Sequence, residues 1–220
     1  GSGSSNTNGS ITSTVSANVD AGFSISTYTG TGANATIGHG LSKAPEMLII
    51  KNREQTDDWI VYHEGITNTS MLRLNTTSAK NTYVTWWNNT SPTSTVFTVS
   101  TEHRNNASSE DYIAYAFHSV DGYSKVGSFE YTGFRPAFIM VKRADATGHW
   151  EIHDTARDVS NPSSKRLFPN YSNAEDPSDG WDILSNGFKL FTDHDSINAD
   201  DGDYIYIAFA ETPFKNSNAR

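Results

Sequence analysis

Short apolar segments separated by polar, turn-forming residues make up most of the chain. The segments that stand out are "MLIIKN", "WIVYHE", "MLRLNTT", "TYVTWW", "TVFTVST" and "DYIAYAF", all rich in β-branched and aromatic residues. Clusters of Gly, Asn, Ser and Pro separate them, which is the pattern of short β-strands joined by frequent turns. No segment shows the 3.6-residue periodicity of an amphipathic helix. We therefore predict an all-β fold.

The segment "DYIAYAF", which begins at Asp111, is apolar on both of its faces. Side chains alternate between the two faces of a strand, so Tyr112 and Ala114 share one face, and Ile113 and Tyr115 share the other. Apolar residues on both faces indicate a central strand that is covered on both sides. Strands of this kind need a second layer, so the sequence favours β-sandwich, jelly-roll-like units.

The chain also contains an internal repeat. "PEMLIIKNR" begins at Pro45 and "PAFIMVKR" begins at Pro136, which is 91 positions later (136 − 45 = 91). Trp59 and Trp150 keep this spacing, and "DYIAYAF" returns as "DYIYIAF" from Asp203. Constant spacing over so much of the chain indicates a duplication. We predict two tandem, related sandwich units; one larger sandwich with two similar halves is the alternative.

The repeat sets the expected domain boundaries. Residues 1–20 are rich in Gly, Ser and Asn and are expected to form a flexible linker, with a short tail at residues 216–220. The first sandwich unit is predicted at residues 21–119 and the second at residues 120–215.

Two kinds of residue recur after the repeated strand. Basic residues are expected where a buried strand emerges into solvent, and the residues concerned are Lys51, Arg53, Lys142 and Arg143. Trp59 and Trp150 precede short apolar strands, and a repeated Trp is more often a core anchor than a binding platform. We therefore expect both indoles in the core.

Composition excludes several classes of function. The formal net charge is -9 and no Lys/Arg cluster interrupts it, so the chain would repel a phosphate backbone, and we expect no nucleic-acid partner. No apolar run approaches the roughly 20 residues that a membrane-spanning helix needs, so we expect no membrane insertion. The chain has no cysteine, which excludes disulfides and thiolate metal sites.

The sequence offers little catalytic chemistry. It contains no G-x-S-x-G nucleophile motif, no H-E-x-x-H motif and no phosphate-binding glycine loop after a strand. In "GHWEIHD", His149 and His153 would lie about 13 Å apart on a strand, too far to share a metal. His63-Glu64 and His153-Asp154 occupy similar places in the two copies, which favours a structural role. We expect no enzyme; a carboxylate pair for glycoside cleavage stays open, because its members can be distant in sequence.

The acidic segment "TDHDSINADDGD" supplies oxygen ligands of the kind that calcium prefers. The candidate calcium ligands are Asp193, Asp195, Asp200, Asp201 and Asp203. Their spacing does not match an EF-hand loop, and the corresponding segment of the first copy keeps few of the carboxylates. A solvated acidic loop that binds no metal is the alternative. Calcium is the one cofactor that the sequence suggests.

The segment "TWWNNTSPTS" is the strongest signal for ligand binding. Trp86 and Trp87 are adjacent, so on a strand they would point to opposite faces, and one indole could be exposed. An exposed indole beside Asn88 and Asn89 could stack on a sugar ring while the amides bind its hydroxyls. The alternative is that both rings are buried.

A second candidate binding segment is "RDVSNPSSKRLFPNYSNAEDPSDG", which is long, irregular and rich in Pro, Asn and Ser. Binding residues are often found on long loops between strands. Tyr171, Arg166 and Asn170 could form part of a receptor-binding surface, and Asn170 aligns with Asn75 of the first copy. Alternatively, the segment only packs against a neighbour.

Three stretches of the chain are distinctive in sequence: "GFSISTYTGTGANATIGHGLSKAPEMLIIKNR", "AYAFHSVDGYSKVGSFEYTGFRPAFIMVKR" and "YIAFAETPFK". They resemble a β-rich domain of tail-fibre-like proteins of marine tailed phages, including phages of cyanobacteria, and the resemblance covers about Gly22 to Lys215. In that family such units recur in tandem beside SPRY-like or laminin-G/concanavalin-like domains. The resemblance implies a virion protein that acts outside the cell, and it implies no catalytic or binding residues.

Together, the residues and the resemblance predict a non-enzymatic virion module that attaches to a polysaccharide or receptor of the host surface. Binding would be weak at each site and strengthened by several copies on one particle. Other fibre subunits are expected partners, in a homo-oligomer. A purely structural fibre element is the alternative, and a polysaccharide-degrading enzyme is the third possibility.

Overall fold

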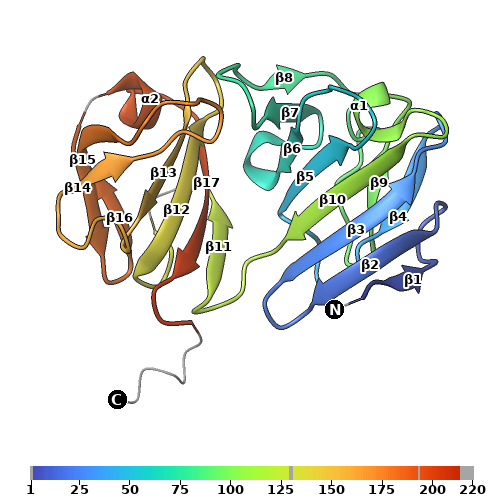
Figure 1. Cartoon of the computed structure of the whole chain (residues 1–220), viewed down its shortest axis with the longest axis horizontal. Helices are drawn as coiled ribbons and strands as arrows, with labels where there is room; N and C mark the ends of the chain where they lie inside the picture. Colours follow the sequence, from blue (N-terminus) through green and yellow to red (C-terminus); the bar gives the residue numbers. More distant parts are fainter. Residues whose placement is uncertain (1, 129–130, 193, 214–220) are drawn as a thin grey trace. The chain divides into compact units, whose positions relative to one another are not determined.

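The structure is a computed structural model that describes residues 2–128, 131–192 and 194–213. The fold is all-β, with 43% of residues in strands and 5% in helices, as the sequence predicts. The chain divides into two compact units, shown in Figure 1. Unit 1 comprises Gly1–Leu74 and Lys80–His118, and unit 2 comprises Asn75–Ala79 and Ser119–Arg220. Among the described residues, no helix is long and apolar enough to cross a membrane.

Unit 1 is built from a large antiparallel sheet and a two-stranded sheet. Its strands are β1 (Ser4–Asn6), β2 (Ser13–Asn18), β3 (Phe23–Thr29), β4 (Ala35–Gly38), β5 (Met47–Asn52), β6 (Ile60–His63), β7 (Ser70–Arg73), β8 (Asn81–Thr82), β9 (Val96–Val99) and β10 (Asp111–Phe117). The large sheet has the order β1-β2-β3-β10-β5-β6-β7-β8, and β4 pairs with β9. Two short helices, η1 (Glu64–Ile66) and α1 (His103–Asn106), interrupt the connections.

The core of unit 1 joins the two sheets. Ile37 of β4 and Phe97 of β9 belong to the same buried cluster as Leu48 of β5 and Ala114 of β10. Each fully buried Ile, Leu or Phe side chain stabilises the fold by about 1.5–3 kcal/mol relative to an exposed one. The two sheets therefore form a sandwich-like pair of layers, as expected for strands that are apolar on both faces.

Unit 2 contains a four-stranded and a three-stranded antiparallel sheet. Its strands are β11 (Ser124–Gly127), β12 (Pro136–Arg143), β13 (Trp150–Asp154), β14 (Ser163–Arg166), β15 (Asp176–Leu184), β16 (Gly187–Leu190) and β17 (Tyr204–Ala210). The orders are β11-β17-β12-β13 and β14-β15-β16, and the helix α2 (Asp195–Asn198) precedes β17. Ile139 and Trp181, one from each sheet, share a buried cluster.

The two units use the same strand pairings. In unit 1, Met47 of β5 lies opposite His63 of β6 and Phe117 of β10. In unit 2, Phe138 of β12 lies opposite Asp154 of β13 and Phe209 of β17. The shift is 91 residues in the first two strands (138 − 47 = 91) and 92 in the third (209 − 117 = 92). These registers support the predicted duplication, which remains a prediction.

Two segments differ from the sequence-based expectation. The stretch expected as a flexible linker forms β1 and β2 instead, and Val15 and Ser13 of β2 are buried. The prediction from the Gly/Ser/Asn composition is wrong here because β2 alternates inward and outward residues. Its residues Thr14–Asn18 pair with β3. The segment "TYVTWW" is not a strand beyond Thr82, because residues 84–89 form turns in which Asn88 and Asn89 have positive φ.

The repeated basic residues also depart from the expectation. Arg53 is exposed, but Lys142 is completely buried. The Lys142 ammonium donates to the backbone carbonyls of Arg143 and Ala146, and the Lys51 ammonium donates to the matching carbonyls of Asn52 and Gln55. The prediction that these lysines mark an exit to solvent is therefore wrong for Lys142. A buried ammonium needs such acceptors, and the turn after the strand supplies them. Arg143 is half-buried and pairs with Asp145.

The repeated tryptophans behave as core residues to different extents. Trp150 is buried, as expected. Trp59 is only half-buried, and its ring stacks on Tyr115 of β10 at a centroid distance of 6.3 Å.

Candidate functional site

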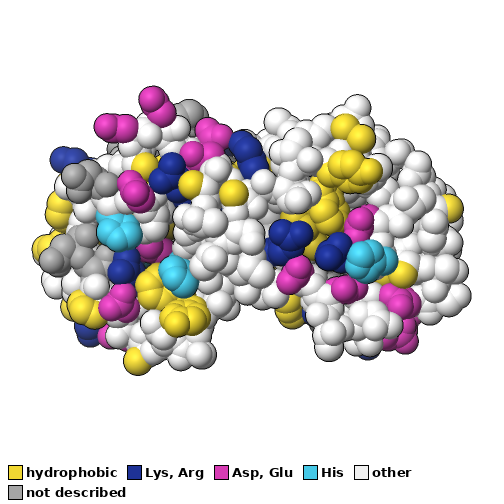
Figure 2. Space-filling model, turned by 90° about the horizontal axis from the view of Figure 1, so that it is seen from above, with side chains coloured by type: hydrophobic (Ala, Val, Ile, Leu, Met, Phe, Trp, Pro, Cys, Tyr) yellow, Lys and Arg dark blue, Asp and Glu magenta, His cyan; other side chains and the backbone are white. Residues whose placement is uncertain are grey.

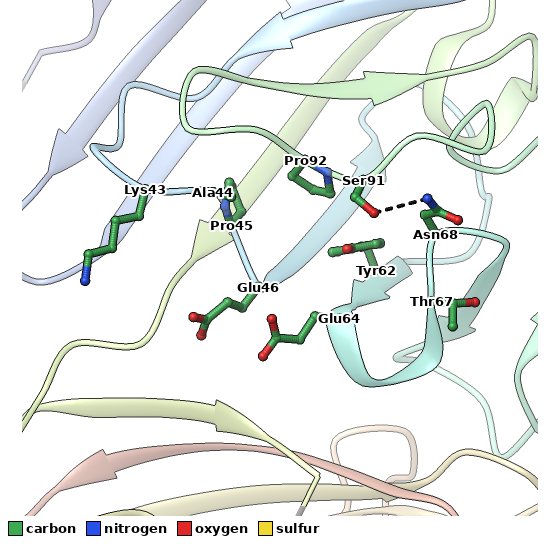
Figure 3. Close-up of a pocket in the computed structure, with 10 residues that line it drawn as sticks. All are labelled: Lys43, Ala44, Pro45, Glu46, Tyr62, Glu64, Thr67, Asn68, Ser91 and Pro92. Carbon is green, nitrogen blue, oxygen red and sulfur yellow. Dashed lines mark hydrogen bonds between the residues drawn. The ribbon is translucent and has the colours of Figure 1, made fainter.

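Unit 1 contains an open pocket of about 590 Å³, shown in Figure 3. It is lined by Lys43, Ala44, Pro45, Glu46, Tyr62, Glu64, Thr67, Asn68, Ser91 and Pro92. These residues come from the segment before β5, from β6 and the turn that follows it, and from the loop before β9. A pocket of this volume suits a small ligand or one or two sugar rings. We call it the unit 1 pocket.

Strand register brings two carboxylates together in this pocket. Met47 and His63 are paired, and one step beyond them the Glu64 N–H donates to the Glu46 carbonyl at 2.8 Å. Glu46 and Glu64 are therefore cross-strand neighbours, and Figure 3 shows their carboxylates side by side. Directly opposite residues of an antiparallel pair have Cβ atoms about 4.5–5.5 Å apart. The two carboxylates thus offer several acceptor atoms within a few ångströms of one another.

Neutral polar groups lie on another side of the same pocket. The Asn68 amide donates to the Ser91 hydroxyl at 3.1 Å, and Tyr62 lies beneath them (Figure 3). Burial raises the pKa of Tyr62, the Ser91 hydroxyl acts in the opposite direction, and the Glu64 charge raises it further. The Tyr62 phenol therefore keeps its proton at neutral pH. The pocket combines donors, acceptors and the apolar surfaces of Pro45 and Pro92.

The segment that the sequence singles out for ligand binding lies beside this pocket, but its tryptophans do not line it. Trp86 and Trp87 are both buried, so the expected exposed indole is absent at both positions. The Trp87 ring packs edge-on against Tyr62 at 5.5 Å, and its N–H donates to the Ser70 carbonyl. The Trp86 N–H donates to Asn81. Trp87 thus supports a residue that lines the pocket, and neither Trp86 nor Trp87 offers an exposed stacking platform.

The remaining residues of the predicted sugar site do not converge on one place. Asn88 and Asn89 are exposed turn residues. The side-chain amide oxygen of Asn88 accepts a hydrogen bond from the side-chain amide of Asn34. Tyr171 belongs to unit 2, in the loop between β14 and β15, and its side chain is 56% exposed. The pocket residues Glu46, Glu64 and Asn68 were missed by sequence reasoning. The β5–β6 register brings Glu46 and Glu64 together, the turn after β6 adds Asn68, and no local motif marks the three residues.

The predicted calcium ligands do not form a cluster in the described part of the chain. Asp193 lies outside the described residues. Asp195 begins helix α2, and Asp201 has a positive φ of 57° in the following turn. The Asp203 N–H donates to the Asp145 carboxylate, which also accepts a hydrogen bond from the Arg143 guanidinium. Within the described ranges, no group of three or more His, Asp or Glu side chains could hold a metal ion.

The two histidine pairs are not equivalent. In unit 1, His63 lies opposite Met47. In unit 2, Phe138 matches Met47, and it lies opposite Asp154 and not opposite His153. His63 and Asp154 each accept a backbone N–H in the next turn, from Gly65 and Arg157 respectively. His63 and Asp154 therefore play the same structural part, as acceptors for the turn that follows each strand. His153 is one position earlier in the register, so it points to the opposite face of the sheet.

His153 belongs to a buried polar cluster in unit 2. Its ring lies 3.1 Å from the Ser163 hydroxyl and 3.9 Å from the Glu151 carboxylate, and it stacks on Trp181. This arrangement of Ser, His and Glu would resemble a hydrolytic triad if a substrate could reach it. Ser163, His153 and Glu151 are each at most 1% exposed, so the serine is inaccessible to a polymer. We assign the cluster to the core.

The surface does not concentrate charge of one sign on the face shown in Figure 2. Lys and Arg side chains are interspersed with Asp and Glu, and hydrophobic side chains form separate groups. The positively charged stripe that tracks a nucleic-acid backbone is not visible on this face.

Comparison with known proteins gives a family and no closer relative. No curated protein and no solved structure matches the chain. One family model matches residues 1–213, and it is described as a domain of unknown function, DUF7483. Because the match covers nearly all of the chain, the protein belongs to the DUF7483 family.

Proposed function

We propose that the chain is a non-enzymatic attachment module that binds carbohydrate in the unit 1 pocket. The observation that carries the proposal is the convergence of two carboxylates, an amide and a hydroxyl around an open space of about 590 Å³. Sugar hydroxyls both donate and accept hydrogen bonds, so they suit a site that combines acceptors such as Glu64 with donors such as Asn68. The C–H faces of a sugar ring suit Pro45, Pro92 and the Tyr62 ring edge.

The proposed setting is a tail fibre or related appendage of a phage virion, outside the cell. The support for this setting is the resemblance of three long stretches of sequence to marine phage fibre proteins. Attachment by many copies on one particle would raise avidity without new contacts, so weak binding at each pocket is sufficient. The ligand would then be a polysaccharide or other glycan of the host surface.

Binding of the whole chain to cells and glycans tests the proposal. The chain has no cysteine, so a single cysteine added after Arg220 allows labelling with one fluorophore. We expect saturable binding to intact marine bacteria or to their surface polysaccharides, measured with and without calcium. Asn68→Ala and Glu64→Gln should weaken it, whereas Asn8→Ala, at an exposed asparagine of the same unit, should leave it unchanged. No binding by a multimerised chain would leave a purely structural role.

One observation favours a second candidate, a polysaccharide-degrading enzyme. Glu46 and Glu64 are cross-strand neighbours, and retaining glycosidases hold two carboxyl groups about 5–5.5 Å apart. Release of reducing ends from the bound polysaccharide would support this candidate, provided that Glu46→Gln and Glu64→Gln each abolish it. For an attachment module we expect unchanged polymer length after prolonged incubation.

A further inference from the structure

An aromatic surface in unit 2 is separate from the unit 1 pocket. We call it the Tyr171 surface; it consists of His149, Arg166, Phe168, Asn170 and Tyr171. The His149 ring contacts the Phe168 ring, at a centroid distance of 4.7 Å, and the Tyr171 ring, at 5.4 Å. The Arg166 guanidinium lies over the Phe168 ring at 5.1 Å. His149 and Phe168 are half-buried, whereas Tyr171 is 56% exposed.

Hydrogen bonds hold this surface in one arrangement. The Trp150 backbone N–H can only donate, so the atom of Asn170 that lies 2.9 Å from it is the amide oxygen. The Asn170 NH₂ group therefore faces His149 Nδ1, at 2.9 Å, and donates to it. In the neutral imidazole, an accepting Nδ1 leaves the proton on Nε2. The Tyr171 N–H donates to the Phe168 carbonyl at 3.1 Å, which closes the turn that carries Tyr171.

The same network determines which polar groups the surface offers to a ligand. Asn170 has a second amide proton, and His149 carries the Nε2 proton, so the groups beside the Tyr171 ring are neutral N–H donors. The Arg166 charge is already paired, with Asp176 at 2.8 Å and with the buried Glu151 at 3.4 Å. The surface therefore combines one exposed aromatic ring with neutral donors and has no uncommitted cation in its centre.

We propose that the Tyr171 surface is a second binding site, and that its ligand is a ring of a neutral saccharide. The C–H face of the sugar packs on the Tyr171 ring, and its hydroxyl oxygens accept from Asn170 and His149. Acidic sugars are disfavoured because Arg166 is engaged by two carboxylates. A protein partner fits poorly, because a stable protein interface covers about 800 Å² on each side and this surface has one exposed ring at its centre.

The site is a property of unit 2 and not of the repeat. In the alignment that matches Asn75 with Asn170, the residue matched with Tyr171 is Thr76, which has no ring. The proposal concerns a different surface from the unit 1 pocket, so either site can fail alone. If both bind, one chain carries two carbohydrate sites, and a polysaccharide that spans them is held with increased avidity.

Ring resonances of the full chain report directly on this surface. We would follow the His149 and Tyr171 ring signals by NMR during titration with neutral methyl glycosides of glucose, galactose and mannose, and with galacturonate. The signals would be assigned from the spectra of His149→Gln and Tyr171→Phe. We expect saturable shifts with at least one neutral glycoside and weaker shifts with galacturonate. No shift with any neutral glycoside, or stronger binding of galacturonate, would overturn the proposal.

Variants separate stacking from a merely structural role. Tyr171→Ala should weaken binding by about tenfold or more, Tyr171→Phe should retain most of it, and Tyr171→Trp should strengthen it by enlarging the platform. The matched control is Tyr83→Ala in unit 1, because Tyr83 is 59% exposed. Equal affinities of the Tyr171→Ala and Tyr171→Trp proteins would refute the stacking role. Asn68→Ala in the unit 1 pocket should not change the titration, which distinguishes failure of this site from failure of the proposed function.

Discussion

Tyr112 and Tyr204 make the same pair of hydrogen bonds in the two units. The Tyr112 hydroxyl donates to the His103 carbonyl and accepts from the Ala107 N–H, across helix α1. The Tyr204 hydroxyl donates to the Asp195 carbonyl and accepts from the Ala199 N–H, across helix α2. Each phenol therefore ties the ends of a single helical turn to the central strand that follows it. Burial raises the pKa of both tyrosines, which keeps these hydroxyls protonated at neutral pH.

Removing either hydroxyl should destabilise the chain without changing the fold. In Tyr112→Phe and Tyr204→Phe, a helix-end N–H and a carbonyl lose their partner, which costs roughly 1–3 kcal/mol when the groups stay buried. We expect the larger loss for Tyr112, which is fully buried, whereas Tyr204 is half-buried. Urea unfolding of each variant measures the change. Tyr83→Phe, at an exposed tyrosine, is the control and should unfold like the parent protein.

Trp87 should contribute to stability and not directly to ligand contact. Its indole is 1% exposed, and replacing a buried Trp by Ala typically costs about 3–5 kcal/mol. We expect Trp87→Ala to lower the free energy of unfolding by this order. Trp59→Ala should cost less, because Trp59 is half-buried.

The measurement for Trp87 is urea unfolding, followed by binding assays under conditions in which the variant is still folded. Trp87 does not line the pocket, but it packs against Tyr62, which does. The folded Trp87→Ala protein should therefore lose ligand affinity only to the extent that Tyr62 moves. A protein of unchanged stability with no binding would contradict the assignment of Trp87 to the core.

Strands that are rich in apolar residues on both faces could be predicted from the sequence. The segment "DYIAYAF" is β10 from Asp111 to Phe117, and "MLIIKN" is β5 from Met47 to Asn52. Both are central strands whose apolar residues on each face are buried or half-buried. The segment "TYVTWW" has the same composition, but the left-handed residues Asn88 and Asn89 turn the chain and bury both indoles. Asn tolerates positive φ better than most residues, and this signal competes with strand propensity.

The candidate site could be predicted only in part. The Trp pair lies next to the unit 1 pocket, because Trp87 packs on the ring of Tyr62. The carboxylates of Glu46 and Glu64 are 18 positions apart (64 − 46 = 18), and only the β5–β6 register places them opposite each other. Lys142 was assigned to solvent because charge usually indicates exposure. Its carbonyl acceptors belong to a turn whose conformation the sequence does not specify.

Lys142 should make stability increase at alkaline pH. Burial lowers its pKa to about 8, below the ordinary value of 10.5. Between these values the unfolded chain binds a proton that the folded chain does not, so the free energy of unfolding rises as pH rises from about 8 to 10.5. The total change is on the order of 3 kcal/mol, at about 1.36 kcal/mol per pKa unit.

Urea unfolding at pH 7, 8, 9 and 10 measures this contribution. Lys142→Met keeps the length of the side chain and removes the charge, so its stability should lack the rise attributed to Lys142. Lys51→Met, at the matching but half-buried position, serves as the control for loss of the turn contacts. Parallel pH profiles of the parent protein and Lys142→Met would contradict the assignment.

Glu151 should make stability decrease in acid. Burial alone would raise its pKa, but the nearby His153, the Ser196 hydroxyl and the Arg166 charge together hold the pKa below the ordinary value of 4.5. The stabilisation is therefore fully present above about pH 4.5 and is lost as pH falls through the lowered folded-state pKa. At the matching position of unit 1 the residue is Ile60, which lies 91 residues earlier (151 − 60 = 91) and has no charge to lose.

Comparing pH profiles of Glu151 variants isolates this effect from other carboxylates. The unfolding free energy of the parent protein and of Glu151→Gln would be measured between pH 7 and pH 3. The difference between them should shrink below pH 4.5, because protonation makes the parent carboxyl neutral like the amide. Glu175→Gln, at an exposed partner of Arg157, should change the profile little, since exposed ion pairs contribute about 0–1 kcal/mol. A constant difference between the parent and Glu151→Gln down to pH 3 would show that Glu151 acts through packing and not through its charge.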